Sequence, residues 1–251
     1  MLVLATLGAS ERRRRLHKKT SQALSEPEPT PVTTGRATII DAAVPLADEA
    51  AARAWLDRAG EEELAVALAV INRALHAFRV VTADPYVHEI AREQALVARI
   101  GFGAGDQVAD GLWSDARELP TSQGRRRRSR SASLEPQARL AATLGGRQRV
   151  LACEELTLRA RTDVDQGRDR EAALQLLIAL DAAVAELPLD PGAASLADRL
   201  DELRGRRKAV AAAAQTALAG ALDDASREVV LDTLGRVEAA LRARAALRIR
   251  D

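Results

Sequence analysis

The stretch at 171–187, EAALQLLIALDAAVAEL, constrains the fold more than any other part of the chain. Its central part holds only two polar residues, Gln175 and Asp181. A helix that is apolar on nearly all sides is stable in water only in the middle of a bundle, and this one is too short to span a membrane. The stretch therefore predicts a helical bundle in the C-terminal half of the chain.

Composition and periodicity extend this prediction to the whole chain. Aromatic residues make up only 2%, and alanine and leucine, which favour helix, dominate the apolar residues. Further helices are expected at 47–59, 61–82, 85–100 and 224–248. The one at 61–82 carries an apolar stripe at steps of four and three: Leu64, Leu68, Ile71, Leu75 and Phe78. The predicted fold class is all-α.

Four segments follow from changes in composition. Residues 1–41 read as a disordered, basic and proline-rich tail, in which a short strand at 36–41 has no partner. Residues 42–119 form a small helical module with a glycine-rich loop. An arginine-rich flexible linker at 120–133 joins it to a helical bundle at 134–250.

The glycine-rich loop at 101–119 is the candidate partner-binding region. Gly101 is interpreted as the C-cap of the 85–100 helix. Beyond it, Phe102, Gln107 and Trp113 are the candidate binding residues, with Phe102 packed at the helix end and Trp113 partly exposed. The alternative is a capped loop whose bulky side chains serve only packing.

Two arginine-rich runs form a second candidate site, for phosphates of nucleic acid. Their members are Arg12, Arg13, Arg14, Arg15, Arg125, Arg126, Arg127, Arg128 and Arg130. No aromatic side chains alternate with them, so any binding is expected to be weak, non-specific and sensitive to salt. The other interpretation is a solvated run of charge, and the net charge of +1 argues against a globally basic nucleic-acid binder.

Catalytic and metal motifs are incomplete. His88 and Glu89 begin like a zinc-protease helix, but Arg92 stands where the second histidine would be. The single cysteine, Cys153, reads as a small core residue and fits a reducing compartment. We therefore expect no metal and no cofactor, and the catalytic residues stay unknown. An enzyme with a pocket near 84–119 is the weaker alternative.

The hairpin at 156–187 resembles a single tetratricopeptide unit. The small and bulky residues that carry the resemblance are Leu156, Ala160, Gly167, Ala172, Leu176 and Ala179. The pattern departs at its end, where the proline comes late, at Pro188, and no second copy follows. The resemblance implies close packing of two helices and a peptide-binding role. The whole chain is also similar to uncharacterised helical proteins of high-GC bacteria, which implies no activity.

These observations favour a non-enzymatic, cytoplasmic adaptor or regulatory protein that acts through protein–protein contacts. A nucleic-acid-associated accessory protein that uses the arginine runs is the alternative. A protein partner is expected and a membrane span is not, because the apolar run at 1–7 is short and precedes the arginines. The sequence leaves the oligomeric state open.

Overall fold

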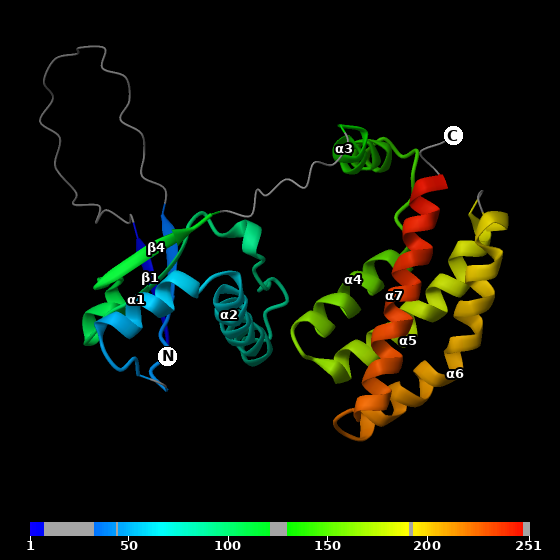
Figure 1. Cartoon of the computed structure of the whole chain (residues 1–251). Coiled ribbons are helices and arrows are strands. Elements are labelled where there is room, and N and C mark those ends of the chain that lie inside the picture. The colour runs from blue at the N-terminus through cyan, green and yellow to red at the C-terminus, as the bar shows by residue number, and fades with distance from the viewer. Residues whose placement is uncertain (8–32, 44, 121–129, 191–192, 248–251) are drawn as a thin grey trace, which may run out of the picture. The chain divides into compact units, whose positions relative to one another are not determined.

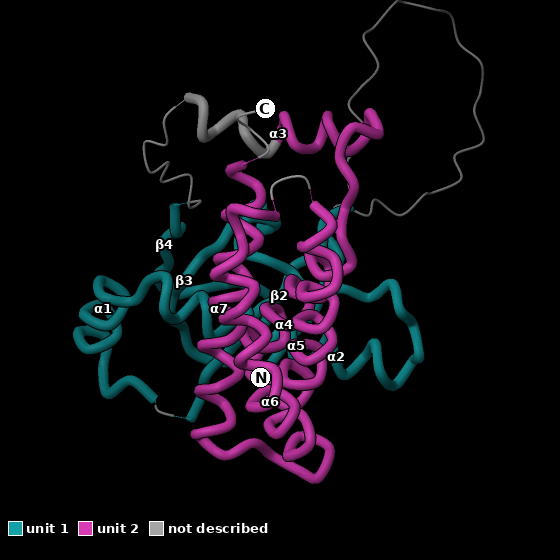
Figure 2. Tube along the Cα trace, turned by 90° about the vertical axis from the view of Figure 1, so that its right-hand side faces the viewer, with its two compact units in different colours: residues 1–126 teal, residues 127–251 magenta. Residues whose placement is uncertain are grey.

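The computed structural model describes residues 1–7, 33–43, 45–120, 130–190 and 193–247, without the side chains of 130–136 (Figure 1). The chain divides into two compact units, residues 1–126 and 127–251 (Figure 2). Its described part is mostly helical, as the composition predicts. Four short strands accompany the helices, and they depart from the expected all-α class.

Unit 1 contains all four strands and two of the helices. Its elements are β1 (Leu2–Leu7), β2 (Thr34–Ile39), α1 (Glu49–Arg58), α2 (Glu61–Thr82), the 3₁₀ helix η1 (Arg92–Gln94), β3 (Ala98–Phe102), the 3₁₀ helix η2 (Asp106–Asp110) and β4 (Asp115–Leu119). The expected helices at 47–59 and 61–82 are confirmed as α1 and α2. Asp48 begins α1 by accepting a hydrogen bond from the Ala51 amide at 2.8 Å.

The strand near residue 36 has a partner, so the prediction of an unpaired strand there was wrong. β1 and β2 run antiparallel, with Leu2 opposite Ile39 and Leu7 opposite Thr34. The Met1 amino group adds a hydrogen bond to the Ile40 carbonyl at 2.7 Å. This pairing joins segments far apart in the chain, and such long-range contacts leave no local periodicity to detect. Residues 8–32 of the predicted tail lie outside the described residues.

The predicted helix at 85–100 does not form. The Asp84 carboxylate accepts a hydrogen bond from the Tyr86 amide at 2.9 Å, which closes a turn instead of beginning a helix. The chain then runs extended through Ile90 to η1 and enters β3. Gly101 lies inside β3, so its assignment as a helix C-cap was also wrong.

The segment at 101–119 is a β-hairpin rather than a loop draped on helices. β3 and β4 run antiparallel, with Ala98 opposite Leu119 and Phe102 opposite Asp115. The short helix η2 lies within the connection between them. α1 packs against both strands, and the α1 side chains Ala52 and Leu56 are buried there. Unit 1 therefore combines helices with two small sheets.

Unit 2 is entirely helical in its described part. Its elements are α3 (Arg130–Leu144), α4 (Ala152–Asp165), α5 (Asp169–Glu186), the 3₁₀ helices η3 (Leu187–Leu189) and η4 (Ala193–Leu196), α6 (Ala197–Ala219) and α7 (Asp224–Leu247). The turn between α4 and α5 places Gly167 at φ +67°, a left-handed conformation that favours glycine. The last helix agrees closely with the expected 224–248, and α3 begins at Arg130, inside the predicted linker.

The core of unit 2 surrounds α5, which packs against α4, α6 and α7. Leu176 and Leu180 are fully buried, and Ala172 and Ala183 let the neighbouring helices approach closely. The predicted central place of this helix in a bundle is thus confirmed. Burial on all sides was not, because the Ile178 side chain is 56% exposed.

Candidate functional site

Polar side chains of unit 1 hold its irregular segments in place. Within the apolar helix α2, the buried Asn72 side chain donates from Nδ2 to the Ile90 carbonyl at 3.1 Å and accepts from the Ile90 amide at 2.9 Å. Together these bonds satisfy both backbone groups of an extended residue. Asn72 therefore fixes the chain at Ile90 against α2, and the sequence analysis gave it no role.

Two arginines of unit 1 serve helix C-termini. Arg36 of β2 donates to the carbonyl of Asp110, at the end of η2, at 2.5 Å. Arg117 of β4 donates to the carbonyls of Leu56 and Ala59, at the end of α1. Cations at these positions satisfy carbonyls that have no helical partner and complement the negative end of the helix dipole. Their contacts are structural.

The three predicted binding residues do not form one surface. Phe102 and Trp113 are each partly buried, and Gln107 is exposed on η2. The Trp113 ring lies against Gly101, where an added Cβ would approach Cε3 to 2.9 Å. Because side chains alternate along a strand, Phe102 and its neighbour Gly101 face opposite sides of β3. Phe102 and Trp113 thus belong to opposite faces of the hairpin.

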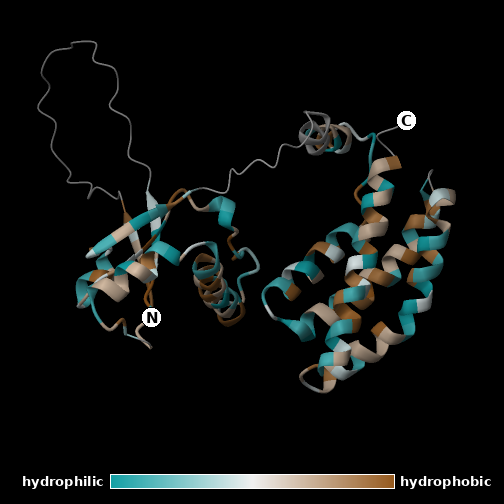
Figure 3. Cartoon of the chain, viewed as in Figure 1, coloured by the Kyte–Doolittle hydropathy of each residue, from teal (hydrophilic) through white to brown (hydrophobic). Residues whose placement is uncertain are grey.

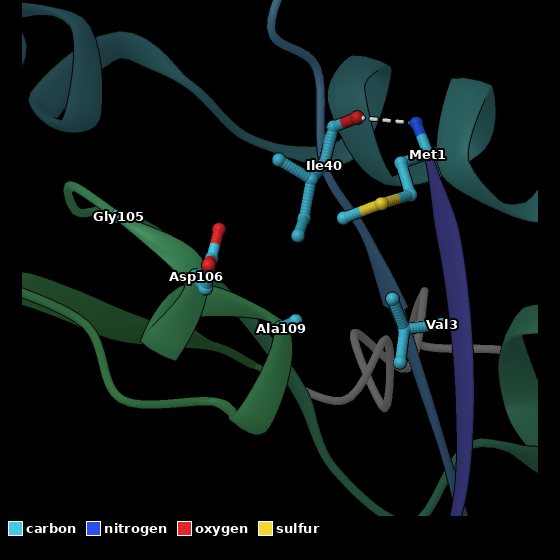
Figure 4. A pocket seen from close by; sticks show the side chains of 6 residues that line it. All are labelled: Met1, Val3, Ile40, Gly105, Asp106 and Ala109. Atoms are coloured by element: carbon cyan, nitrogen blue, oxygen red, sulfur yellow. Dashed lines mark hydrogen bonds between the residues drawn. The ribbon is translucent and has the colours of Figure 1, made fainter.

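A cavity of about 430 Å³ lies beside the β1–β2 sheet (Figure 4). Its lining comes from the N-terminal strands on one side and from η2 on the other, and consists of Met1, Val3, Ile40, Gly105, Asp106 and Ala109. The polar side chain among them is the Asp106 carboxylate. The cavity is mostly apolar and open, and none of the other described side chains that line it could form an acid–base pair with Asp106.

A largely uncovered apolar surface of unit 1 lies on α2. Apolar residues recur along the whole helix (Figure 3). One set points into unit 1, where Ile71 is buried and Leu64, Leu68 and Leu75 are partly buried. The outward stripe, as we call the second set, lies on the other side of the helix and is largely exposed. Its members are Glu62, Val66, Val70, Arg73, Ala77, Val80 and Val81.

Exposure of the outward stripe is high for side chains of this type. Val66 is 66% exposed and Val81 is 85% exposed. Tyr86, which follows the helix, is 83% exposed. Contiguous apolar surface of this kind marks binding sites more often than single exposed residues do. The sequence contains the signal for this surface, since the valines recur at steps of four and three just as the stripe with Leu64 does.

The outward stripe also carries two charges. Glu62 and Arg73 lie on it about three helical turns apart, and neither forms an ion pair with the described residues. Arg73 stands in the middle of the stripe, between Val70 and Ala77. Any surface that covers the stripe must therefore supply a negative group opposite Arg73, because burial of an unpaired charge is costly.

Among the described residues, two helical segments are long and apolar enough to cross a membrane, judged by length and composition alone: α2, and α5 together with η3. The expectation that the stretch at 171–187 is too short for a span was therefore wrong on length, because its helix extends over Asp169–Leu189. α5 is apolar because it is the core helix of unit 2, where its neighbours cover part of its surface. Little of α2 is covered. Asn72 and Arg73 lie at its centre, however, and residues of this kind are costly inside a bilayer.

A buried polar cluster lies at one end of the unit 2 bundle. The Arg244 side chain of α7 is buried and donates from Nε to Asp190 at 2.6 Å and from Nη1 to Glu154 at 2.9 Å. Its neighbour Cys153 is fully buried, and burial, reinforced by the Glu186 carboxylate, raises the pKa of its thiol to about 12. A thiol with so high a pKa is unreactive, in agreement with its predicted core role.

The Glu186 carboxylate begins α4. It accepts hydrogen bonds from the backbone amides of Ala152 at 3.2 Å and Cys153 at 2.9 Å, so it satisfies two amides at the helix N-terminus. Burial raises the pKa of this carboxyl, but these hydrogen bonds and the nearby Arg244 outweigh burial and lower it below 4.5. The cluster joins α4, α5 and α7 and has a structural role.

The predicted phosphate-binding arginines cannot be placed. Arg12 to Arg15 and Arg125 to Arg128 lie outside the described residues, and Arg130 is described only as the first residue of α3. In the described ranges, no group of three or more His, Cys, Asp or Glu side chains is arranged to hold a metal ion. His88, expected on a helix, is exposed in the extended segment.

Comparison of this chain with protein-family models, with curated proteins and with solved structures finds no match.

Proposed function

We propose that this chain is a helical adaptor protein, and that its N-terminal unit binds an amphipathic helix of a protein partner along the outward stripe of α2. The observation that carries the proposal is the exposure of Val66, Val80 and Val81 on a helix whose opposite side carries the buried Ile71. In the proposal, unit 1 supplies the binding surface, and unit 2 is a separate module stabilised by its own core.

The spacing of the stripe favours a helix as the partner. Val66, Val70, Arg73, Ala77 and Val80 follow one another at steps of four, three, four and three. This is the repeat with which two helices pack side by side over several turns, because it keeps one seam facing the partner. A partner helix would insert its side chains between those of the stripe and carry a carboxylate near Arg73.

The polar chemistry of the described residues supports binding over catalysis. In unit 1, Asn72, Arg36 and Arg117 are engaged with backbone groups. In unit 2, the Cys153 thiol and Arg244 are buried inside the bundle. Because these polar groups stabilise the structure, the apolar surface of α2 is the feature best suited to a binding function.

Photo-crosslinking tests the proposal. A photoreactive amino acid is placed at Val66 in the full chain expressed in its host, and crosslinked peptides are identified by mass spectrometry. Val150 is the matched control, because it is the same residue type in unit 2 and is 64% exposed, against 66% for Val66.

Reproducible crosslinks from position 66 to one helical segment of a protein, absent from position 150, are the expected result. Equal, scattered crosslinking at both positions would mean that the stripe binds no protein.

A further inference from the structure

We infer that the helix that binds the outward stripe between Glu62 and Arg73 is α2 of a second copy of this chain, arranged antiparallel, so that the protein is a homodimer. The inference rests on the proposed function and names its partner. It is carried by the positions of the two unpaired charges on the stripe, Glu62 and Arg73, and by the small and large side chains between them.

Charge determines the direction of the second helix. In a parallel pair in register, Arg73 would face Arg73 and Glu62 would face Glu62, and like charges oppose association. In an antiparallel pair whose two-fold axis passes midway between positions 67 and 68, Glu62 of each copy faces Arg73 of the other. One two-fold interface therefore forms the same ion pair twice.

Side-chain size agrees with this register. In an antiparallel pair, the residue numbers of two facing positions have a constant sum. With position 62 opposite position 73 this sum is 135, so Val66 lies opposite Ala69 and Val70 lies opposite Ala65. Both alanines are exposed on α2. A large residue then meets a small one at each step, which lets the two helices approach closely and fill the space between them.

The same charges weigh against a lipid surface as the occupant. A bilayer that covered Val66 and Ala77 would also have to accept Arg73, which stands between them. An ionised side chain in the hydrocarbon region is unfavourable unless it is paired or reaches the interface. A second α2 supplies the pairing carboxylate, and hydrocarbon does not.

Charge reversal in the full chain tests the dimer. Sedimentation equilibrium is measured for the wild type, Glu62→Arg, Arg73→Glu and the double variant, with circular dichroism to verify folding. The wild type should be a dimer, and each single reversal should weaken it by about tenfold or more, because two attractive contacts become repulsive. The double variant should return to within a few-fold of the wild-type dissociation constant.

Two further measurements separate the outcomes. Val66→Glu should give a monomer, and the matched Val150→Glu should stay dimeric. A wild-type chain that is monomeric at all concentrations, or a double variant as weak as the single ones, would overturn the dimer. If position 66 then still crosslinks to another protein, the proposed function stands although the chain is not a dimer.

Flotation with phosphatidylcholine–phosphatidylglycerol vesicles tests whether a lipid surface, rather than a second copy of the chain, binds the outward stripe. Association that Val66→Glu abolishes would identify lipid as the ligand and overturn the dimer. Absence of association is the expected result.

Discussion

The Asn72 side chain forms two hydrogen bonds with the backbone of Ile90, one in each direction, at 3.1 and 2.9 Å. A polar side chain in the middle of an apolar helix thereby decides the path of a segment eighteen residues further along the chain. The extended course from Tyr86 to η1 depends on this contact, since an extended residue has no helical neighbours to satisfy its amide and carbonyl.

Replacement of this asparagine is expected to destabilise unit 1. Asn72→Leu keeps the size of the side chain but leaves the Ile90 amide and carbonyl without their partner, which costs about 1–3 kcal/mol of unfolding free energy. Both tryptophans of the chain, Trp55 and Trp113, lie in unit 1, so urea unfolding followed by tryptophan emission reports on this unit. Arg53→Leu, on the exposed side of α1, is the control and should change little.

Gly101 and Gly35 offer a matched test of the hairpin geometry. Both glycines lie in strands. An added Cβ at Gly101 would come within 2.6 Å of the Asp115 carbonyl oxygen, whereas nothing lies within 4 Å of one at Gly35. Gly101→Ala should destabilise unit 1 by about 1–3 kcal/mol, and Gly35→Ala should be neutral or slightly stabilising. Equal effects in tryptophan-monitored unfolding would contradict the close strand contact.

The buried arginine of unit 2 should be essential to its stability. Arg244→Met removes the cation and leaves the carboxylates of Asp190 and Glu154 without it, and loss of one partner of a buried pair costs about 3–5 kcal/mol. Arg242→Met is the control, because Arg242 lies on the same helix with its side chain 70% exposed. Hydrogen exchange of α5 and α7 peptides reports on unit 2 alone. Similar exchange rates in the two variants would place Arg244 outside the core.

The Glu186 carboxylate predicts an acid-sensitive unit 2. Because its folded pKa is lowered below 4.5, its contribution to stability is fully present above that pH and is lost as the pH falls through the folded value. Glu186→Gln should therefore be less stable than the wild type at pH 7, and the difference should shrink below about pH 4. Thermal melts of both proteins between pH 7 and pH 3 measure this convergence. A constant difference across the range would show that the carboxyl does not titrate as the α4 cap.

The sequence alone determined the parts of the fold that depend on local pattern. The stripe of α2 is periodic over many residues and the apolar run of α5 is long, and long patterned segments of these kinds favour one local structure. The small residues of the α4–α5 hairpin likewise indicated close packing, since only side-chain size was needed to foresee it.

Tertiary structure decided what rests on contacts between distant residues. The pairing of β1 with β2 and the path of the chain at Ile90 are fixed by partners that no local window contains. The local pattern at 85–100 therefore predicted a helix that does not form. The outward stripe of α2 could be counted in the sequence, yet which of the two apolar faces of α2 stays uncovered depended on where β2 and the segment at Ile90 pack against the helix. The local pattern shows that a face of a helix is apolar, but the packing of the other elements determines whether that face is buried.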